Sequence, residues 1–312
     1  MAKPRILFMG TPAFALPALE MIHSHNYPVI GVVTQPDRPA GRGQKEIAPP
    51  VKILAQKFGL PVFQPQKVRD KSFLDIFYQL NPEMVVVAAF GQILPKTIIE
   101  FPKLGCLNIH PSLLPKYRGA APLNWSIIQG ETKTGVTIMV MDEGMDSGDI
   151  LLQSETPLGA TETYGQLYDH LAKEGADLLM TAIEQVIAGT ALRHSQDSSA
   201  VTFAPRLTKE TGRINWQESS TDIVNLIRGL SPAPAAYTFL EGQALKIFAA
   251  EPKPGKRKEI PGTIGADTSY GLSVAAAEGY VILKEVQLAG KKRMPIDEFL
   301  RGHRLQPKTI LQ

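Results

Sequence analysis

Residues 6–34 read ILFMGTPAFALPALEMIHSHNYPVIGVVT, and this stretch decides the fold class. It opens with four apolar residues and then Gly10-Thr11-Pro12, as a buried parallel strand does where it leads into a helix. Apolar residues then recur with helical spacing from Ala13 to His25, and a second apolar run covers residues 29–34. This order of strand, helix and strand predicts the start of an α/β sheet.

The same alternation continues through the first 190 residues. Further strands are predicted at residues 84–89, 106–109, 136–141 and 150–153, and helices at residues 51–58 and 161–188. Pro49 and Pro50 suit the start of the first of these helices, and Gly189 suits the end of the second. We therefore expect a doubly wound, mostly parallel α/β sheet.

The pattern changes after the long helix. Residues 194–204 are polar with little periodicity, and a short helix is predicted at residues 221–229. Short β-like runs follow, at residues 236–240, 244–250, 262–264, 272–275 and 280–286. Such runs are typical of a small antiparallel barrel or sandwich. We expect a first domain at residues 1–190, a linker at residues 191–206 and a β domain at residues 207–312.

The charge is unevenly distributed. The chain has 33 Lys and Arg against 30 Asp and Glu, a net charge of +3, which excludes a histone-like basic coat. Residues 206–312 carry 16 cations against 11 anions, whereas the residues before them carry 17 against 19. The two parts therefore have net charges of +5 and −2, which indicates different partners.

Several classes of protein and site are not expected. The single cysteine, Cys106, excludes an intramolecular disulfide and a cysteine-cluster metal site, and its apolar strand favours a role in core packing. Gly10 stands alone and Pro12 lacks an amide donor, so the pattern of a dinucleotide site is not met. No leader pattern and no apolar run of about 20 residues is present. We expect a soluble cytoplasmic protein without a membrane partner or a bound metal.

A cationic loop follows the second predicted strand, at the edge where open α/β sheets bind ligands. Residues 35–45 contain two Pro, two Gly and three cations, Arg38, Arg42 and Lys45. These cations suit contact with phosphate groups or nucleic acid. A solvated loop that aids solubility is the alternative.

The strongest candidate for chemistry is the end of the strand at residues 106–109. Alternation places Asn108 and His110 on one face, where the imidazole can act as a base and the amide as an oxyanion donor. Residues 141–149 hold four carboxylates, and we expect one of them to orient His110. A core histidine beside an acidic turn is the alternative. Ser112 lacks the G-x-S-x-G context of a hydrolase nucleophile.

Four segments together resemble the signature of the 10-formyltetrahydrofolate-dependent formyltransferases. They are NIHPSLLP at residues 108–115, YRGAAP at residues 117–122, GVTI at residues 135–138 and DSGD at residues 146–149. Residues 10–12 and 34–43 are similar to the members of this family that act on initiator methionyl-tRNA. The resemblance extends from Arg5 to about Arg293 and excludes the end of the chain from His303.

This resemblance implies a Rossmann-like catalytic domain and a C-terminal β-barrel similar to an OB fold. It implies an enzyme that transfers the formyl group from N10 of 10-formyltetrahydrofolate to the α-amino group of methionine on initiator tRNA. We expect a monomer. The resemblance further implies roles for individual residues: catalysis for Asn108, His110 and Asp146, folate binding for Ser112, Leu113, Leu114 and Pro115, and tRNA binding for the loop that carries Arg38, Arg42 and Lys45.

Two alternatives remain. One is a related formyltransferase that acts on a sugar nucleotide or a purine precursor; the cationic loop and the +5 C-terminal part favour a polyanion over these small acceptors. The other is a tRNA-binding protein without catalytic activity. The complete set Asn108, His110 and Asp146 argues against this second alternative.

Overall fold

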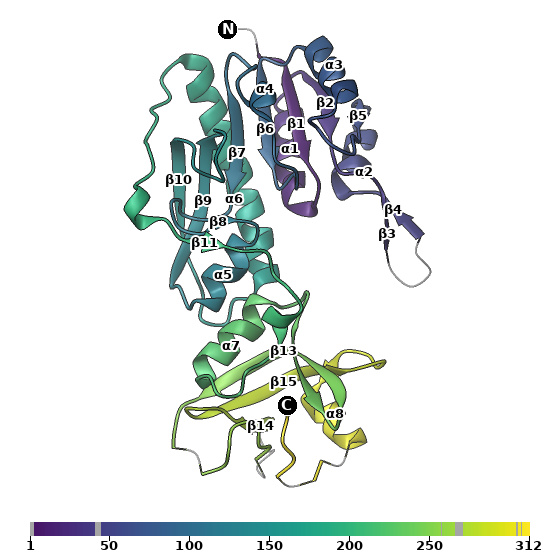
Figure 1. Ribbon diagram of the computed structural model, residues 1–312, viewed down its shortest axis with the longest axis vertical. Helices are drawn as coiled ribbons and strands as arrows, with labels where there is room; N and C mark the ends of the chain where they lie inside the picture. The colour runs from purple at the N-terminus through teal and green to yellow at the C-terminus, as the bar shows by residue number, and fades with distance from the viewer. Residues whose placement is uncertain (1–2, 41–44, 257, 266–270, 304, 307) are drawn as a thin grey trace. The chain divides into compact units, whose positions relative to one another are not determined.

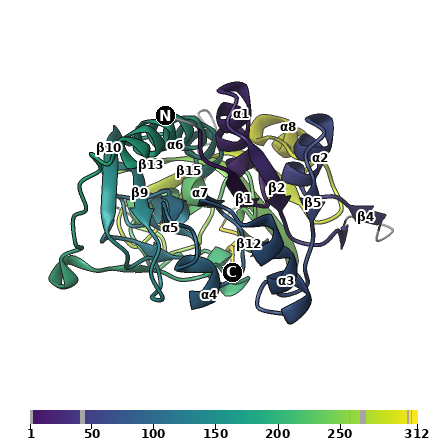
Figure 2. The same cartoon turned by 90° about the horizontal axis from the view of Figure 1, so that it is seen from above.

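The computed structural model describes residues 3–40, 45–256, 258–265, 271–303, 305–306 and 308–312 (Figures 1 and 2). The chain divides into two units. The first comprises Met1–Gly119, Thr134–Thr156 and Tyr168–Phe203, and the second comprises Ala120–Lys133, Pro157–Leu167 and Ala204–Gln312. Two segments that precede residue 168 therefore cluster with the C-terminal part of the chain.

A seven-stranded sheet with the order β10-β9-β7-β6-β1-β2-β5 forms the centre of the first unit. Its strands are β1 (Ile6–Gly10), β2 (Val29–Val33), β5 (Val62–Phe63), β6 (Met84–Ala88), β7 (Cys106–His110), β9 (Lys133–Val140) and β10 (Ile150–Pro157). The five strands from β7 to β5 along this order are parallel, and β9 runs antiparallel to β7. The expected Rossmann-like α/β sheet is confirmed, as a mixed sheet.

Helices cover both faces of this sheet (Figure 2). One face carries α1 (Leu16–Ser24), α2 (Pro50–Lys57) and α6 (Tyr164–Ala188), and the other carries α3 (Lys71–Leu80) and α4 (Lys96–Ile99). Phe73 and Phe77 of α3 pack in one core cluster with Leu7 of β1 and Val85 of β6. Both faces of the sheet are thus buried, as the continuous apolar strands predict.

Helix α6 lies very close to the strands that carry the candidate site. A Cβ atom on Gly175 would lie 2.8 Å from Cγ2 of Ile109 in β7 and 3.2 Å from Cγ1 of Val136 in β9. Only glycine allows this approach without a shift of the helix. The contact fixes β7 and β9 against the helix layer.

Helix boundaries follow the proline and glycine positions. Pro50 is the first residue of α2, and Gly189, with φ of 69°, follows the last residue of α6. Residues 13–15 form a 3-10 turn, η1 (Ala13–Ala15), and α1 begins only at Leu16. Pro17 occupies the first turn of α1, where its missing N–H leaves no helical hydrogen bond broken.

Shorter elements complete the two units. They are β3 (Arg38–Ala40), β4 (Lys45–Ile47), β8 (Arg118–Gly119), η2 (Ser198–Ala200), β11 (Phe203–Ala204), η3 (Glu210–Gly212) and α5 (Pro122–Ile128). β3 and β4 pair as an antiparallel hairpin that leaves the sheet after β2 (Figure 1). None of the helices in the described ranges is both long and apolar enough to cross a bilayer.

An antiparallel sheet with the order β12-β13-β15-β14 forms the core of the second unit, and β16 pairs with β15. Its elements are α7 (Ser220–Gly229), β12 (Ala236–Leu240), β13 (Gln243–Lys253), β14 (Leu272–Ala275), β15 (Tyr280–Leu288), β16 (Met294–Pro295) and α8 (Ile296–Gly302). Leu245, Val274, Leu283 and Phe299 are among its buried core residues. A separate antiparallel β unit is confirmed.

The strand expected at residues 262–264 is the exception. These residues form only single bridges, from Thr263 to Ile310 and from Ile264 to Val274, so the expectation of a regular strand is wrong. Gly262 has φ of 87°, outside the extended region, which interrupts a regular ladder at this point. These residues are buried, but their bridge partners lie on two different segments.

The C-terminal tail lies along the edge of this sheet. Phe239 of β12 exchanges two backbone hydrogen bonds with Gln312, at 2.8 and 3.0 Å. Leu311 N donates to Gly262 O at 2.9 Å, and Ile264 N donates to Thr309 O at 2.9 Å. Residues 309–312 therefore link the edge strand β12 to residues 262–264, which bridge to β14.

Candidate active site

The end of strand β7 carries the two candidate side chains. β7 lies between β6 and β9, with Asn108 opposite Val87 and His110 opposite Thr137. Asn108 and His110 are 7% and 4% exposed. The neighbouring strands thus hold both side chains at one strand end, two residues apart.

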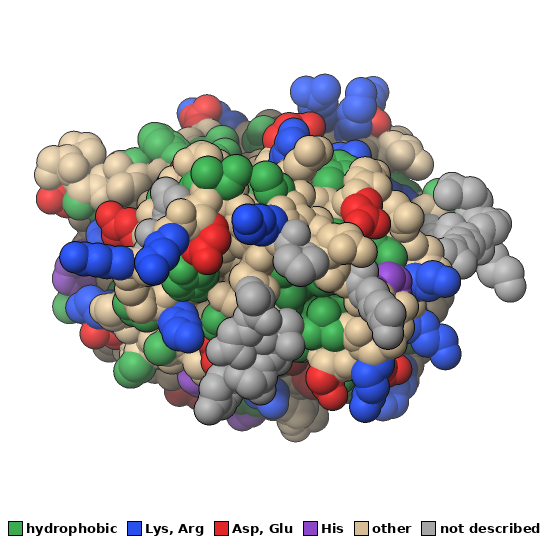
Figure 3. All heavy atoms as spheres, turned by 90° about the horizontal axis from the view of Figure 1, so that it is seen from below, with side chains coloured by type: hydrophobic (Ala, Val, Ile, Leu, Met, Phe, Trp, Pro, Cys, Tyr) green, Lys and Arg blue, Asp and Glu red, His purple; other side chains and the backbone are tan. Residues whose placement is uncertain are grey.

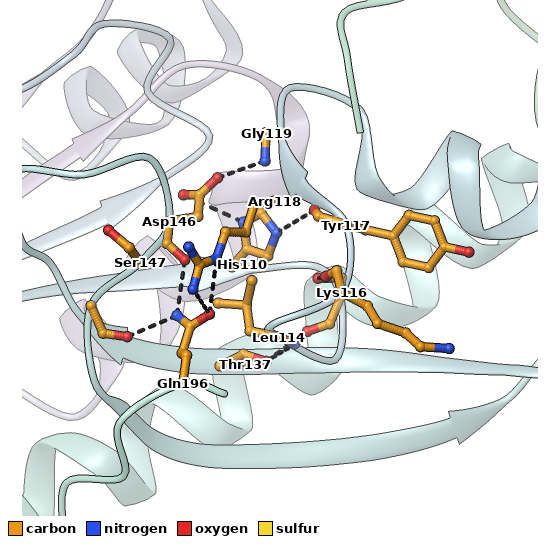
Figure 4. A network of polar contacts seen from close by, with 12 residues as sticks. His110, Leu114, Lys116, Tyr117, Arg118, Gly119, Thr137, Asp146, Ser147 and Gln196 are labelled. Atoms are coloured by element: carbon orange, nitrogen blue, oxygen red, sulfur yellow. Dashed lines mark hydrogen bonds and ion pairs between the residues drawn. The ribbon is translucent and has the colours of Figure 1, made fainter. Parts of the chain in front are cut away.

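Both ring nitrogens of His110 face acceptors (Figure 4). Nε2 lies 3.0 Å from the carbonyl oxygen of Tyr117, so it carries a hydrogen and donates to that oxygen. Nδ1 lies 3.6 Å from Oδ1 of Asp146, a side chain that is 19% exposed. Gly119 N donates to Oδ2 of Asp146 at 2.8 Å. The backbone of Tyr117 therefore holds the imidazole of His110, and the backbone of Gly119 holds the carboxylate of Asp146.

The four carboxylates of residues 141–149 have different partners. Asp142 accepts from the Ser147 hydroxyl at 2.8 and 2.9 Å, and Asp149 accepts from the Ser195 hydroxyl at 3.1 Å. Glu143 forms an ion pair with Lys96 at 2.6 Å. Asp146 faces His110. Residue types alone leave all four carboxylates open as partners of the histidine, and the folded loop separates them.

The side-chain amide of Asn108 is available for a ligand. Within the described ranges it has no hydrogen-bond partner, although the residue is almost fully buried. Among the described residues, the fully buried side-chain atom without a partner is Thr34 Oγ1 and not an amide atom of Asn108, so this amide retains accessible surface. Its N–H donors can therefore bind an oxygen atom of a substrate at the end of β7.

The loop after β7 is held by its own polar groups. Ser112 is fully buried, and its hydroxyl donates to Lys116 O at 2.7 Å. Leu114 is 3% exposed, and its N–H donates to Thr137 Oγ1 at 3.2 Å. Leu113 and Pro115 are partly exposed, and a Cβ atom on Gly135 would lie 2.8 Å from Cδ2 of Leu113. Ser112 and Leu114 thus stabilise the loop, and Leu113 and Pro115 retain accessible surface.

Two exposed apolar side chains flank this edge of the sheet. Ile93, in the loop after β6, is 90% exposed, and Met145, in the loop between β9 and β10, is 62% exposed. Lys96, the first residue of α4, forms an ion pair with Glu143 of the loop between β9 and β10. The exposed Met145 directly precedes Asp146 in that loop.

Arg118 and Gln196 are two further residues that belong to this constellation. The guanidinium of Arg118 donates twice to Oε1 of Gln196, at 3.0 and 2.7 Å (Figure 4). Nε2 of Gln196 donates to the backbone oxygens of Asp146 and Gly148, at 2.9 and 2.8 Å. Sequence reasoning missed Gln196, because it lies in a polar stretch without periodicity. Arg118 lies in the YRGAAP segment of residues 117–122, and the family resemblance implies no role for it.

Two of the three candidate cations, Arg38 and Lys45, lie on the β3–β4 hairpin. Arg38 is exposed and donates to Oε1 of Gln35 at 3.2 Å. Lys45 is the first residue of β4 and pairs with Ala40. Arg42 lies outside the described residues. The hairpin follows β2, which two strands, β1 and β6, separate from β7 in the sheet.

Cys106 lies on β7 and is fully buried. Burial raises the pKa of its thiol, because a thiolate is poorly solvated there. The expected role in core packing is confirmed, since a neutral, inaccessible thiol is a poor nucleophile. Within the described ranges, no three His, Cys, Asp or Glu side chains gather as a metal site would require.

Comparison with known proteins assigns this constellation to a family. The sequence pattern described as "Formyl transferase" matches residues 4–183, and that described as "Formyl transferase, C-terminal domain" matches residues 206–304. The methionyl-tRNA formyltransferase of Syntrophus aciditrophicus (strain SB) is 56% identical over 315 residues, which cover 100% of both chains.

Solved structures agree in fold. WlaRD, a sugar 3N-formyl transferase, is 21% identical with a TM-score of 0.68, over 94% of this chain and all of that one. The methionyl-tRNA formyltransferase of Clostridium thermocellum is 18% identical with a TM-score of 0.57, over 91% of this chain and 98% of that one. At these identities the likeness concerns the fold alone. Because the family pattern covers more than half of the sequence and a relative matches it from end to end at 56% identity, the chain belongs to the formyl transferase family.

Proposed function

We propose that this enzyme transfers the formyl group of 10-formyltetrahydrofolate to the α-amino group of methionine esterified to initiator tRNA. One observation carries the proposal. The side-chain amide of Asn108, without a protein partner in the described ranges, lies two residues from His110, which faces Asp146. The 56% identity to a methionyl-tRNA formyltransferase over the whole chain supports this acceptor.

Asn108 is proposed to bind the oxygen of the reacting carbon. The free amine of the methionyl group attacks the formyl carbon, and the carbonyl oxygen becomes an oxyanion. A hydrogen bond from the Asn108 amide stabilises this charge, and in comparable sites the loss of one such donor costs about 3–4 kcal/mol. Only 7% of Asn108 is exposed, so a bound substrate that covers this strand end keeps water from competing for the donor.

The His110–Asp146 pair is proposed to move the proton. The amine loses a proton as the new C–N bond forms, and N10 of the folate gains one as the old C–N bond breaks. Asp146 is the more accessible member of the pair, and Nδ1 of His110 lies 3.6 Å from it. This distance shortens to a hydrogen bond in the substrate complex, since catalytic contacts are often long in the free enzyme. Tyr117 O holds Nε2 throughout.

The residues at this edge fit a flat, partly apolar co-substrate. Ile93 and Met145 offer exposed apolar surface on the loops after β6 and after β9. Leu113 and Pro115 add partly exposed apolar surface on the loop after β7. Such a surface with few polar groups suits a pterin ring and its linker. Leu113 and Pro115 are proposed to contact the folate, and Ser112 and Leu114 to shape their loop.

The tRNA is proposed to bind through cations. Arg38 and Lys45 lie on the β3–β4 hairpin, Arg42 lies in the sequence between them outside the described residues, and residues 206–312 have a net charge of +5. We propose that the second unit is a barrel similar to an OB fold. The contacts of residues 309–312 with both β12 and residues 262–264 support this closure. Neutralised phosphates then make binding strongly dependent on salt.

The decisive experiment offers the purified enzyme 10-formyltetrahydrofolate and charged initiator tRNA. Formylmethionyl-tRNA is the expected product, measured after mild hydrolysis of the ester. Uncharged initiator tRNA is the control that lacks the amine, and a dTDP-linked amino sugar tests the alternative acceptor. Turnover of the sugar with no turnover of the tRNA would overturn the proposal. WlaRD lends that alternative only a shared fold.

The remaining expectations stay predictions. They are a monomeric state, a cytoplasmic location, and activity without a membrane or a bound metal. Sedimentation velocity at micromolar concentration tests the first, and an assay after dialysis against EDTA tests the last.

A further inference from the structure

We propose that Arg118 and Gln196 are positioning residues that hold Asp146 in place beside His110. This inference rests on the proposed function for its assay, but it concerns the geometry of the acid–base pair rather than the identity of the formyl acceptor. Neither residue is placed to take part in the chemistry itself. Both act through the backbone of the loop between β9 and β10.

Asp146 needs external support because of its backbone. Its φ of 49° lies in the left-handed region, which is unfavourable for a residue with a side chain. Residues 142–145 of its loop are exposed, and the loop contains two glycines, Gly144 and Gly148. A loop of this composition samples other conformations unless contacts from outside it restrain the chain.

Gln196 supplies that restraint. Its amide donates to the oxygens of Asp146 and Gly148, at 2.9 and 2.8 Å, so one side chain joins two carbonyls of the catalytic loop. Fifty residues separate Gln196 from Asp146 in the sequence. The bonds therefore act as a tertiary clamp on the loop.

Arg118 strengthens and orients this clamp. Its guanidinium donates twice to Oε1 of Gln196, at 3.0 and 2.7 Å. These bonds fix which end of the Gln196 amide faces the loop. They also polarise the amide, so its N–H groups become stronger donors to the two carbonyls. Charge-assisted bonds of this kind are roughly twice as strong as neutral ones.

Hydrogen bonds and the chain itself join Asp146, Gly119, Arg118 and Gln196 in a closed ring, and His110 lies beside this ring (Figure 4). Gly119 N donates to the Asp146 carboxylate, Arg118 binds Gln196, and Gln196 binds the Asp146 backbone. Tyr117 O accepts from His110. Three consecutive residues, 117–119, thus contact the histidine, the clamp and the carboxylate.

The segment that carries Gln196 is itself anchored at both ends. His194 exchanges two backbone hydrogen bonds with Ile150 of β10, at 2.8 and 2.9 Å. Thr202 O accepts from Arg118 N at 2.9 Å, and Thr202 Oγ1 accepts from Tyr117 N at 2.9 Å. Residues 194–202 therefore connect the loop of Asp146 with the tripeptide of Arg118. This explains physically why a polar stretch without periodicity has a defined path.

The test compares Gln196→Ala, Arg118→Ala and Gln196→Glu with the wild-type enzyme. We expect kcat to fall about 10- to 100-fold in each, because a displacement near 1 Å costs that much in rate. The KM values for both substrates should stay within about threefold, since the clamp acts on Asp146. Gln196→Glu retains size but loses both donated N–H groups, so it should be as inactive as Gln196→Ala.

Ser195→Ala is the matched control. Ser195 lies on the same segment, but its hydroxyl binds Asp149 rather than Asp146. It should retain wild-type kcat. Arg118→Lys should recover part of the rate, because an ammonium can still donate to Gln196 Oε1.

A cycle with Asp146→Asn separates positioning from general stability. If Gln196 acts through Asp146, Gln196→Ala should cause little further loss in the Asp146→Asn background. An equal further loss there, or a KM effect without a kcat effect, would overturn the proposal. The ring NMR signals of His110 provide a readout without substrate. They should shift in Gln196→Ala and remain in place in Ser195→Ala.

These outcomes are distinct from failure of the proposed function. If the wild-type enzyme formylates another amine, the kinetic series is repeated with that acceptor. The NMR comparison is independent of any acceptor. Unchanged His110 signals in both Gln196→Ala and Arg118→Ala would refute the clamp even in a fully active enzyme.

Discussion

Thr34 and Thr137 are both fully buried, and they differ in what their hydroxyl groups bind. Thr137 Oγ1 donates to Ser112 O at 2.6 Å and accepts from Gln153 Nε2 at 2.9 Å. Thr34 Oγ1 has no hydrogen-bond partner within the described ranges. We expect Thr34→Val to stabilise the protein by about 1 kcal/mol, and Thr137→Val to destabilise it by about 2 kcal/mol. Urea unfolding measures both, and a destabilised Thr34→Val would contradict this account.

Substitutions of the two proposed catalytic side chains on β7, Asn108 and His110, should affect the reaction in different ways. Asn108→Ala should lower kcat about 10²- to 10³-fold with little change in KM, because its donor acts mainly on the oxyanion. His110→Ala should nearly abolish formylation while the affinity for tRNA stays close to normal. Steady-state kinetics measure the rates of both variants, and filter binding measures their affinity for tRNA. Retained turnover in His110→Ala would remove the histidine from catalysis.

The buried thiol of Cys106 should make the stability of the fold depend on pH. Burial raises the pKa of its thiol, so the folded protein keeps the proton, whereas the unfolded chain releases it above a pH of about 8.5. This group therefore reduces the stability of the fold as the pH rises above that value. Iodoacetamide at pH 8.5 should leave the native protein unmodified and alkylate it in urea. Rapid alkylation of the native protein would show that the thiol is accessible.

At the scale of elements, the C-terminal tail acts as part of the second sheet. Leu311 is 2% exposed in the core of the second unit, whereas its neighbour Ile310 is 43% exposed. We expect Leu311→Ala to cost about 2–5 kcal/mol, since it leaves a cavity. Ile310→Ala is the control and should cost much less. Equal stabilities in calorimetry would mean that the tail does not contribute to the fold.

At the scale of the whole molecule, the sequence order and the spatial units differ. Helix α5 belongs to the second unit, where Nδ2 of Asn124 donates to Gly229 O and a Cβ on Gly229 would lie 2.7 Å from Ile128. A chain that ends at residue 205 loses α7, and the face of α5 that packs on it is exposed. We expect this shortened chain to melt below the intact protein and to aggregate, in calorimetry and size exclusion. A monomer with an unchanged melting temperature would contradict this.

Much of the element order follows from local patterns. The strands β1, β2, β6 and β7 were predictable because buried parallel strands are short apolar runs that end in turns. Residues 262–264, Gly-Thr-Ile, are also buried, but their two bridge partners come from different parts of the chain. Pairing over such distances leaves no periodic signal. Composition therefore predicts burial better than it predicts a strand.

The sequence by itself determined the alternation of strands and helices, the buried Cys106, and the spacing of Asn108 and His110 along one strand, because these depend on neighbouring residues. Only the tertiary structure decided which carboxylate faces His110, since each of the four in residues 141–149 finds a different partner. It also brought Gln196 to Asp146 across fifty residues. Such contacts depend on how the chain returns to the sheet edge, which local spacing does not encode.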